Sequence, residues 1–348
     1  TELTHTVFSA AGPPDDIAAF LQKVAAGLVD LPLDRLDLEA RVLMAESMND
    51  RASVWSSMLA HRFGPRGPGL VAYPEYGLRR LDADEVSGWA EKYFTADNAV
   101  LILTGPPPEG LRLPLPRGNA SPLPSWPDDG LPDEPTNVVE QDGGASLLVF
   151  GERTTPFRLA ADVVQHRLET RLRHELGRVY AVNHQYMAIA PNEAAVIWGA
   201  DSDPAHAVEV AEVLANSVAE MAAHGPSQDE LEHLNKKSLN EARLHPNMVK
   251  EADVHWRGTS LLLGDAYDGL VNTMVARAEA DPAEVANALE RPASRAIAAF
   301  SADADTGFAP PPLLSDQPID GRTFRWKQNK HHRLVVGRDA VAYNFGDE

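Results

Sequence analysis

Two glutamates, Glu39 and Glu46, have a spacing that could support metal chemistry. They lie seven residues apart in the stretch 33 to 50, LDRLDLEARVLMAESMND, so on a helix they share one face. Apolar residues at helical spacing around them predict a packed, rigid element. A carboxylate on a rigid helix can serve as a metal ligand, whereas two carboxylates on a surface helix would only be solvated. The stretch alone leaves both interpretations open.

The elements around this helix predict a mixture of helices and strands in the first hundred residues. The helix itself is predicted to run on toward His61, with a strand over residues 4 to 9 before it. A helix over 82 to 94 and a buried strand over 98 to 105 follow it. Ten of the chain's 27 prolines then fall in residues 106 to 135, which indicates an extended connector between two domains.

The second part of the chain predicts a further set of strands and helices. Residues 137 to 142 and 145 to 151 are predicted to pair as neighbouring strands around Gly143 and Gly144. Helices are predicted over 157 to 175, 204 to 223, 227 to 244, 249 to 263 and from 281, and strands over 178 to 188, 193 to 200 and 295 to 300. The last residues alternate like strands and predict a short β appendage.

The two parts repeat the same order of elements. Leu-Glu occurs at residues 38 and 39 and again at 231 and 232, which sets the offset at 193 residues. The second copy has 56 residues before its strand at 193, whereas the first has 3 before its strand at 4, so we expect about 53 residues upstream of Thr1. The resulting assignment is the later part of a first half (1–105), a linker (106–136), a second half (137–309) and a β-rich tail (310–348).

The charge balance narrows the possible partners. With 31 basic and 51 acidic residues the formal net charge is −20, which argues against nucleic acid and anionic membranes and favours cationic ligands such as basic peptides. The chain has no cysteine, so it forms no disulfides and uses no thiolate. No apolar run has the length of a membrane span, so we expect a cytoplasmic or otherwise soluble protein, with any signal peptide upstream of Thr1.

Four stretches carry a family resemblance, and they occur in a fixed order. They are LEARVLMAE (38 to 46), YGLRRLDADEVSGWAEKYFTADNAVLILTG (76 to 105), LRHELGRVYAV (172 to 182) and SQDELEHLNKKSL (227 to 239). Together they resemble the insulinase/pitrilysin-type zinc metallopeptidases, which include the mitochondrial processing peptidases. The resemblance implies an α+β fold of two related halves, each a mainly antiparallel sheet covered by helices, closed like a clamshell around an extended peptide.

The same resemblance implies roles for four residues. Glu46 matches a zinc ligand of the family, and Glu39 would orient a ligand or balance charge. Arg173 would bind a carbonyl or carboxylate of the substrate, and Tyr180 would donate a hydrogen bond to the scissile carbonyl as its oxygen becomes anionic. The alternative for these last two is a helix-end arginine and a strand tyrosine at an interface. Either strand 178 to 188 or strand 193 to 200 could present an edge for an extended peptide.

The family's zinc motif, His-x-x-Glu-His, does not occur in the 348 residues, so three functions stay open. The first is a zinc-dependent endopeptidase whose histidine pair lies upstream, in which case this chain alone would not hold zinc tightly. The second is a non-catalytic subunit that binds peptide or forms a homodimer or heterodimer with a related subunit. The third is a different enzyme that uses His166 and Glu169, although Thr170 occupies the place of a second histidine.

Overall fold

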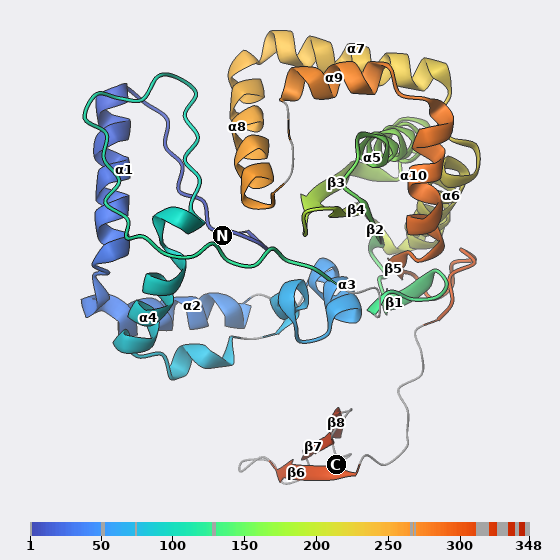
Figure 1. Cartoon of the computed structure of the whole chain (residues 1–348). Helices are drawn as coiled ribbons and strands as arrows, with labels where there is room; N and C mark the ends of the chain where they lie inside the picture. The colour runs from blue at the N-terminus through green and yellow to red at the C-terminus, as the bar shows by residue number, and fades with distance from the viewer. Residues whose placement is uncertain are drawn as a thin grey trace. The chain divides into compact units, whose positions relative to one another are not determined.

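The computed structural model describes residues 2–49, 53–73, 75–126, 130–264, 267, 269–310, 320–325, 333–337 and 341–344. The chain divides into two compact units, Thr1–Pro310 and Pro311–Glu348. The second unit contains a three-stranded antiparallel sheet in the order β6-β7-β8 (Figure 1). Its strands are β6 (Gly321–Arg325), β7 (Arg333–Gly337) and β8 (Val341–Asn344).

The first unit is built on a five-stranded sheet in the order β1-β5-β2-β4-β3 (Figure 1). β1 runs parallel to β5, and the other neighbouring pairs run antiparallel, so the sheet is mixed but mainly antiparallel. β1 and β3 lie at the two edges. The strands are β1 (Thr136–Glu140), β2 (Gly144–Glu152), β3 (Val179–Ala188), β4 (Glu193–Ser202) and β5 (Ile297–Phe300).

The predicted pairing of the two strands around Gly143 and Gly144 is wrong. Both strands form, but β5 lies between them and pairs with each. All four residues of β5 are buried, which suits an interior strand, whereas β1 is only partly buried, which suits an edge. Gly144 sits at the start of β2 with φ 141°, where a Cβ would lie 2.2 Å from the Ala200 carbonyl oxygen, so the close approach of β2 to β4 requires glycine.

One face of the sheet is covered by α5 (Thr155–Leu168), α6 (Ala207–His224) and α10 (Pro282–Ser294). In α5 the apolar residues Phe157, Val164 and Leu168 recur at helical spacing and are fully buried against the sheet. Thr154 caps this helix, since its hydroxyl accepts from the Phe157 N–H at 3.3 Å. Trp198 of β4 is also fully buried, and its indole N–H donates to the Ala161 carbonyl at 3.2 Å.

The other face of the sheet is covered by α3 (Val54–Phe63). The predicted continuous helix toward His61 is therefore wrong, because α2 (Leu36–Asn49) and α3 are separate helices. Ser53 starts α3 as its N-cap, accepting from the Ser56 N–H at 3.1 Å. Met58, Leu59 and Phe63 pack onto Leu148, Phe150 and Ile297, so α3 completes the core of a sheet whose strands come from after residue 135.

The two strands predicted over residues 4 to 9 and 98 to 105 are wrong, because neither stretch is a strand in the structure. A β pattern needs a neighbouring strand to pair with, and these stretches pair with no described residue as strands. Several of their apolar side chains are exposed instead: Val7, Phe8, Val100 and Leu101. The described part of this region holds the helices α1 (Pro14–Val29), α2 and α4 (Ala83–Tyr93), and the clamshell of two related halves stays a prediction.

Three further helices extend past the β3 edge of the sheet (Figure 1). They are α7 (Gln228–Leu244), α8 (Pro246–Leu262) and α9 (Leu270–Ala278), of which the sequence did not predict α9. A capping box between Ser227 and Glu230 starts α7. Among the described residues, no helix combines the length and apolarity that a membrane crossing requires.

Candidate functional site at the free edge of the sheet

The strand order decides which strand can accept an extended peptide. β4 pairs with β2 on one side and β3 on the other, so its backbone groups are already committed. Among the described residues β3 pairs with β4 alone, and no described strand lies on its other side. Of the two strands that the sequence suggested, β3 is therefore the one with an edge for β-augmentation.

The segment that leads into β3 has an unusual backbone. The end of α5 continues as a π-helix, η6 (Glu169–Glu175), and such segments frequently occur at functional sites. Gly177 then adopts a left-handed φ of 63°, and the Arg178 N–H donates to the Leu172 carbonyl at 2.8 Å, which closes the end of the π-helix. Glycine adopts this left-handed φ without steric cost, so Gly177 allows the helix to end and the strand to begin.

A β-bulge follows directly after this helix end. The register between β3 and β4 shifts between Val179 and Val182, so β3 has one more residue here than β4. A bulge turns a side chain away from the regular alternation of a strand. Tyr180 lies inside the bulge, and 91% of it is exposed. Val179 and Val182 on either side of it are buried, so the bulge accounts for the exposure of the tyrosine.

The structure places Arg173 and Tyr180 beside each other. The Arg173 guanidinium carbon lies 6.0 Å from the centre of the Tyr180 ring, the outer limit of a cation–π contact. Arg173 is exposed as well. Neither side chain is part of the core, so both are available to a ligand at the start of β3. Their roles in binding or catalysis stay predictions.

The two glutamates of α2 lie on the protein surface. Glu39 accepts an ion pair from Arg35 at 2.9 Å, with 54% of its side chain exposed. Glu46 is exposed and makes no hydrogen bond or ion pair with a described residue. Among the described residues no three histidine, aspartate or glutamate side chains converge as a metal site, so these residues do not by themselves fit a catalytic zinc, which takes three protein ligands.

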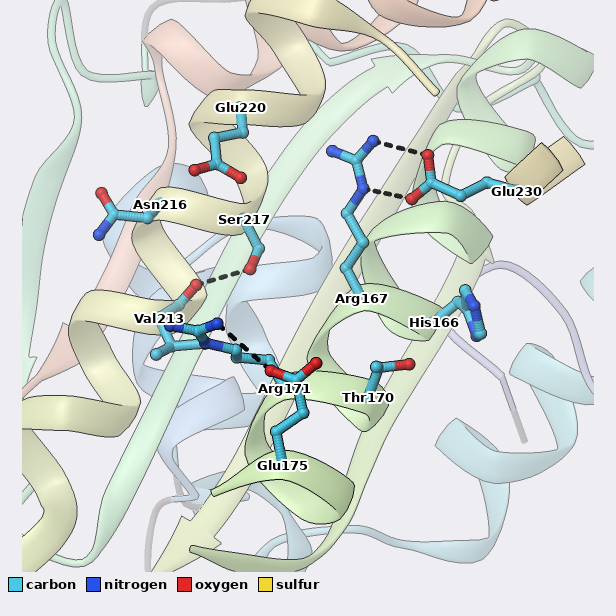
Figure 2. A pocket seen from close by; sticks show the side chains of 10 residues that line it. All are labelled: His166, Arg167, Thr170, Arg171, Glu175, Val213, Asn216, Ser217, Glu220 and Glu230. Atoms are coloured by element: carbon cyan, nitrogen blue, oxygen red, sulfur yellow. Dashed lines mark hydrogen bonds and ion pairs between the residues drawn. The ribbon is translucent and has the colours of Figure 1, made fainter. Parts of the chain in front are cut away.

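A cavity of about 400 Å³ opens between α5 with η6 on one side and α6 on the other (Figure 2). Two ion pairs lie on its walls. Arg167 donates from Nε and Nη2 to the two carboxylate oxygens of Glu230 at 2.7 and 3.0 Å, and Arg171 donates to Glu175 at 3.2 Å. None of the four residues predicted to form the site lines this cavity. The Arg167–Glu230 pair links α5 to α7 at this wall.

His166 and Glu169 are not paired with each other. His166 lines the cavity and stacks on His233 at 4.8 Å between ring centres, and burial lowers its pKa. Glu169 accepts a hydrogen bond from Gln165 at 3.0 Å. A histidine that acts as a general base is usually oriented by a carboxylate, and His166 does not contact the carboxylate of Glu169. The geometry therefore offers no support for an enzyme built on these two residues.

Sequence reasoning missed a polar cluster beside the distal part of β3. Asp162 of α5 accepts from Arg277 of α9 at 2.7 Å, and its other oxygen lies 3.2 Å from Nε2 of His184 of β3. Burial opposes ionisation of Asp162, but the His184 hydrogen bond and the nearby cations outweigh it and lower the pKa of the carboxyl. The i,i+4 spacing of Arg158 and Asp162 on a predicted helix was the available signal.

Comparisons with solved structures identify the fold. The chain is similar to a peptidase M16 inactive domain from Pseudomonas fluorescens, with a TM-score of 0.64 and 15% identity over 87% of this chain and 77% of that one. It is also similar to a protease from Helicobacter pylori, with a TM-score of 0.59 and 13% identity over 82% of this chain and 77% of that one. Pitrilysin matches with a TM-score of 0.52 and 14% identity over 83% of this chain and 35% of that one.

Neither a protein-family model nor a curated protein matches the chain. At the identities given above, structural similarity establishes the fold and not the activity. The chain thus has a mixed fold of helices and strands that resembles M16-type peptidase chains, whereas the two related halves and the clamshell stay predictions.

Proposed function

We propose that this chain binds an extended peptide along the free edge of β3, and that Tyr180 and Arg173 hold one end of it. The observation that carries the proposal is the exposure of Tyr180, 91% of which faces solvent from a bulge on an unpaired strand edge. An aromatic side chain in that position adds nothing to the core. It presents a ring and a hydroxyl to whatever pairs with the edge.

The length and charge of the site suit a peptide. From Tyr180 to Tyr186 the strand covers about 20 Å at roughly 3.3 Å per residue, so about six peptide residues can pair with it. Backbone hydrogen bonds would supply affinity, and Arg173 would bind a carbonyl or carboxylate of the peptide through its planar fork. The net charge of −20 favours a peptide with basic residues elsewhere along its length.

Peptide binding can be measured by fluorescence anisotropy with a library of labelled ten-residue peptides, and the bound edge can be located by NMR. We expect the amide signals of β3 to shift and Tyr180→Ala to weaken binding about tenfold. Arg171→Ala is the matched control, because Arg171 lies on the same π-helix but pairs with Glu175. Peptides that bind without shifting β3 amides, or that bind Tyr180→Ala as well as the natural chain, would contradict the proposal.

A second candidate function is zinc-dependent peptide cleavage. The fold likeness to a protease from Helicobacter pylori and the exposed carboxylate of Glu46 favour it. Since the described residues do not form a zinc site, imidazole ligands would have to come from outside them, either from another segment or from a related subunit in a dimer. In the full-length natural protein, loss of peptidase activity in Glu46→Gln would support cleavage. Unchanged activity in that variant would support the peptide-binding role alone.

A further inference from the structure

The side chain of Arg158 on α5 is held in an unusual way. Its guanidinium carbon lies 4.3 Å from the Trp256 ring centre and 5.2 Å from the Tyr186 ring centre. The two rings belong to α8 and β3 and contact each other at 5.9 Å. The arginine is thus fixed against two aromatic rings contributed by two further elements of the fold, at the distal part of the β3 edge strand.

This fixed guanidinium interacts with an acid only through space, because the charge of Asp162 acts on it without a direct ion pair among the described residues. Arg158 makes no hydrogen bond or ion pair with any residue that the structure describes, and it is partly buried. The two oxygens of Asp162 are directed to His184 and Arg277 instead. Burial is the largest influence on Arg158 and lowers the pKa of its guanidinium, which reflects a charge that solvent does not fully compensate.

The charges around Arg158 do not cancel. The cluster holds two arginines, Arg158 and Arg277, against one carboxylate, Asp162, with His184 counted as neutral. The neighbouring Arg257 forms its own ion pair with Asp253 at 2.7 Å. One positive charge therefore remains, in a chain whose acidic residues exceed its basic ones by 20. A guanidinium keeps its charge in this setting and presents a planar fork that matches a carboxylate.

We propose that Arg158, which lies against Trp256 and Tyr186, is a binding site for a carboxylate of the peptide that lies along β3. The ligand is a monoanion, because one unbalanced positive charge is available. A guanidinium that lies against aromatic rings can still donate from the edge of its fork, where a carboxylate would accept two parallel hydrogen bonds. The carboxylate is either an acidic side chain or the C-terminus of the peptide. The peptide itself rests on the function proposed above, whereas the carboxylate site does not.

The selectivity of the site can be measured with matched peptides. A peptide that binds the chain is made with a free C-terminus or a C-terminal amide, and separately with glutamate or glutamine at each position. We expect one of the carboxylates to improve binding about tenfold in the natural chain, since charge-assisted hydrogen bonds are stronger than neutral ones. Arg158→Gln should abolish that preference and bind the neutral peptide as the natural chain does. Arg257→Gln is the control and should retain the preference.

A second measurement needs no peptide, so it separates this proposal from the peptide-binding function. Sodium acetate is titrated against the chain with sodium chloride at equal ionic strength as the reference, and the side-chain NMR signals of Arg158 and Trp256 are followed. Saturable shifts with acetate that are absent in Arg158→Gln support the site, even if no peptide binds. The carboxylate site is overturned if peptides bind without a preference for a carboxylate. It is also overturned if acetate shifts the NMR signals no more than chloride does. Equal melting temperatures of the natural chain and the variant establish that the variant is folded.

Discussion

Removing the carboxylate of Glu193 should destabilise the chain far more than removing an exposed carboxylate. Glu193 of β4 accepts an ion pair from Arg62 of α3 at 2.6 Å across 131 residues of sequence. The Arg62 side chain is fully buried and 18% of the Glu193 side chain is exposed. The pair fixes α3 to the β3–β4 hairpin, the part of the sheet that carries the candidate peptide edge.

The expected loss in the free energy of unfolding follows from the burial of the pair. Removing one partner of a buried ion pair costs about 3–5 kcal/mol, because the other charge stays buried without compensation. Arg62 keeps cation–π contacts at 4.2 Å to Phe150 and 4.8 Å to Phe63, and Glu193 is slightly exposed, so we expect Glu193→Ala to cost about 3 kcal/mol. The control is Glu39→Ala, which breaks an arginine–glutamate pair at 2.9 Å with both side chains more than half exposed, and should cost at most about 0.5 kcal/mol.

Urea unfolding followed by tryptophan fluorescence measures both variants. Trp126 reports on this region, since its ring lies 5.5 Å from Phe63 and its indole N–H donates to the Ile189 carbonyl at 2.8 Å. The double variant of Arg62→Met with Glu193→Leu should recover much of the stability, because it leaves no buried charge. Equal costs for Glu193→Ala and Glu39→Ala would refute the reasoning, since burial would then play no part.

Three further predictions concern individual residues, each tested by the free energy of unfolding. Gly177→Ala should cost about 1 kcal/mol, because alanine disfavours the left-handed φ of 63° at this position. No atom lies within 4 Å of the added Cβ, so no steric clash adds to this cost. Gly27→Ala inside α1 is the opposite case and should stabilise the chain by about 0.5–1 kcal/mol. Burial opposes ionisation of Glu230, but hydrogen bonds from Arg167 and the capping box outweigh it and lower the pKa of Glu230 to about 2. The natural chain should therefore be more stable than Glu230→Gln by its full margin above pH about 5, and this margin should shrink as the pH falls toward about 2. Trp198→Phe should cost about 2 kcal/mol, since it leaves a gap in a fully buried position and removes the donor to Ala161.

Local patterns predicted the elements of the second part of the chain well. The helices that became α6, α7 and α10 and the strand that became β5 lie close to their predicted positions, because each has a strong period and a recognisable start. The order of strands could not be predicted in the same way. The position of β5 between β1 and β2 depends on contacts between residues about 150 apart in sequence, and a short strand pattern contains no information on its neighbours.

In the first part of the chain, sequence patterns alone did not predict the secondary structure correctly. The stretches 4 to 9 and 98 to 105 have strand-like composition, but strand propensity acts only where a neighbour provides pairing and burial. The separation of α2 from α3 depended on a single cap at Ser53. α9 was missed because it is nine residues long and contributes no fully buried side chain.

Some features of the candidate site could be predicted from the sequence and others could not. The spacing of Arg173 and Tyr180 could be read from the sequence, but the exposure of Tyr180 depends on a bulge that only the register with β4 reveals. The stacking of Arg158 could not be predicted, since it joins residues from α5, β3 and α8 that lie about 30 and 100 positions away. Sequence spacing finds side chains on one element, whereas a site assembled from three elements requires the fold.

A free strand edge promotes aggregation unless something limits what can pair with it. On β3 three consecutive exposed polar residues, Asn183, His184 and Gln185, lie between the bulged and the distal end of the strand. They make the edge unsuitable for an apolar strand from another molecule, while the backbone remains able to pair. Selectivity would then come from the ends, with Tyr180 at the bulge and, about six residues further along β3, Tyr186 with Arg158 of α5 beside it. Peptides shorter than about six residues cannot reach both ends, so binding should strengthen abruptly near that length and the increase should disappear in Arg158→Gln. A gradual increase with length, equal in both proteins, would show that the edge binds by backbone pairing alone.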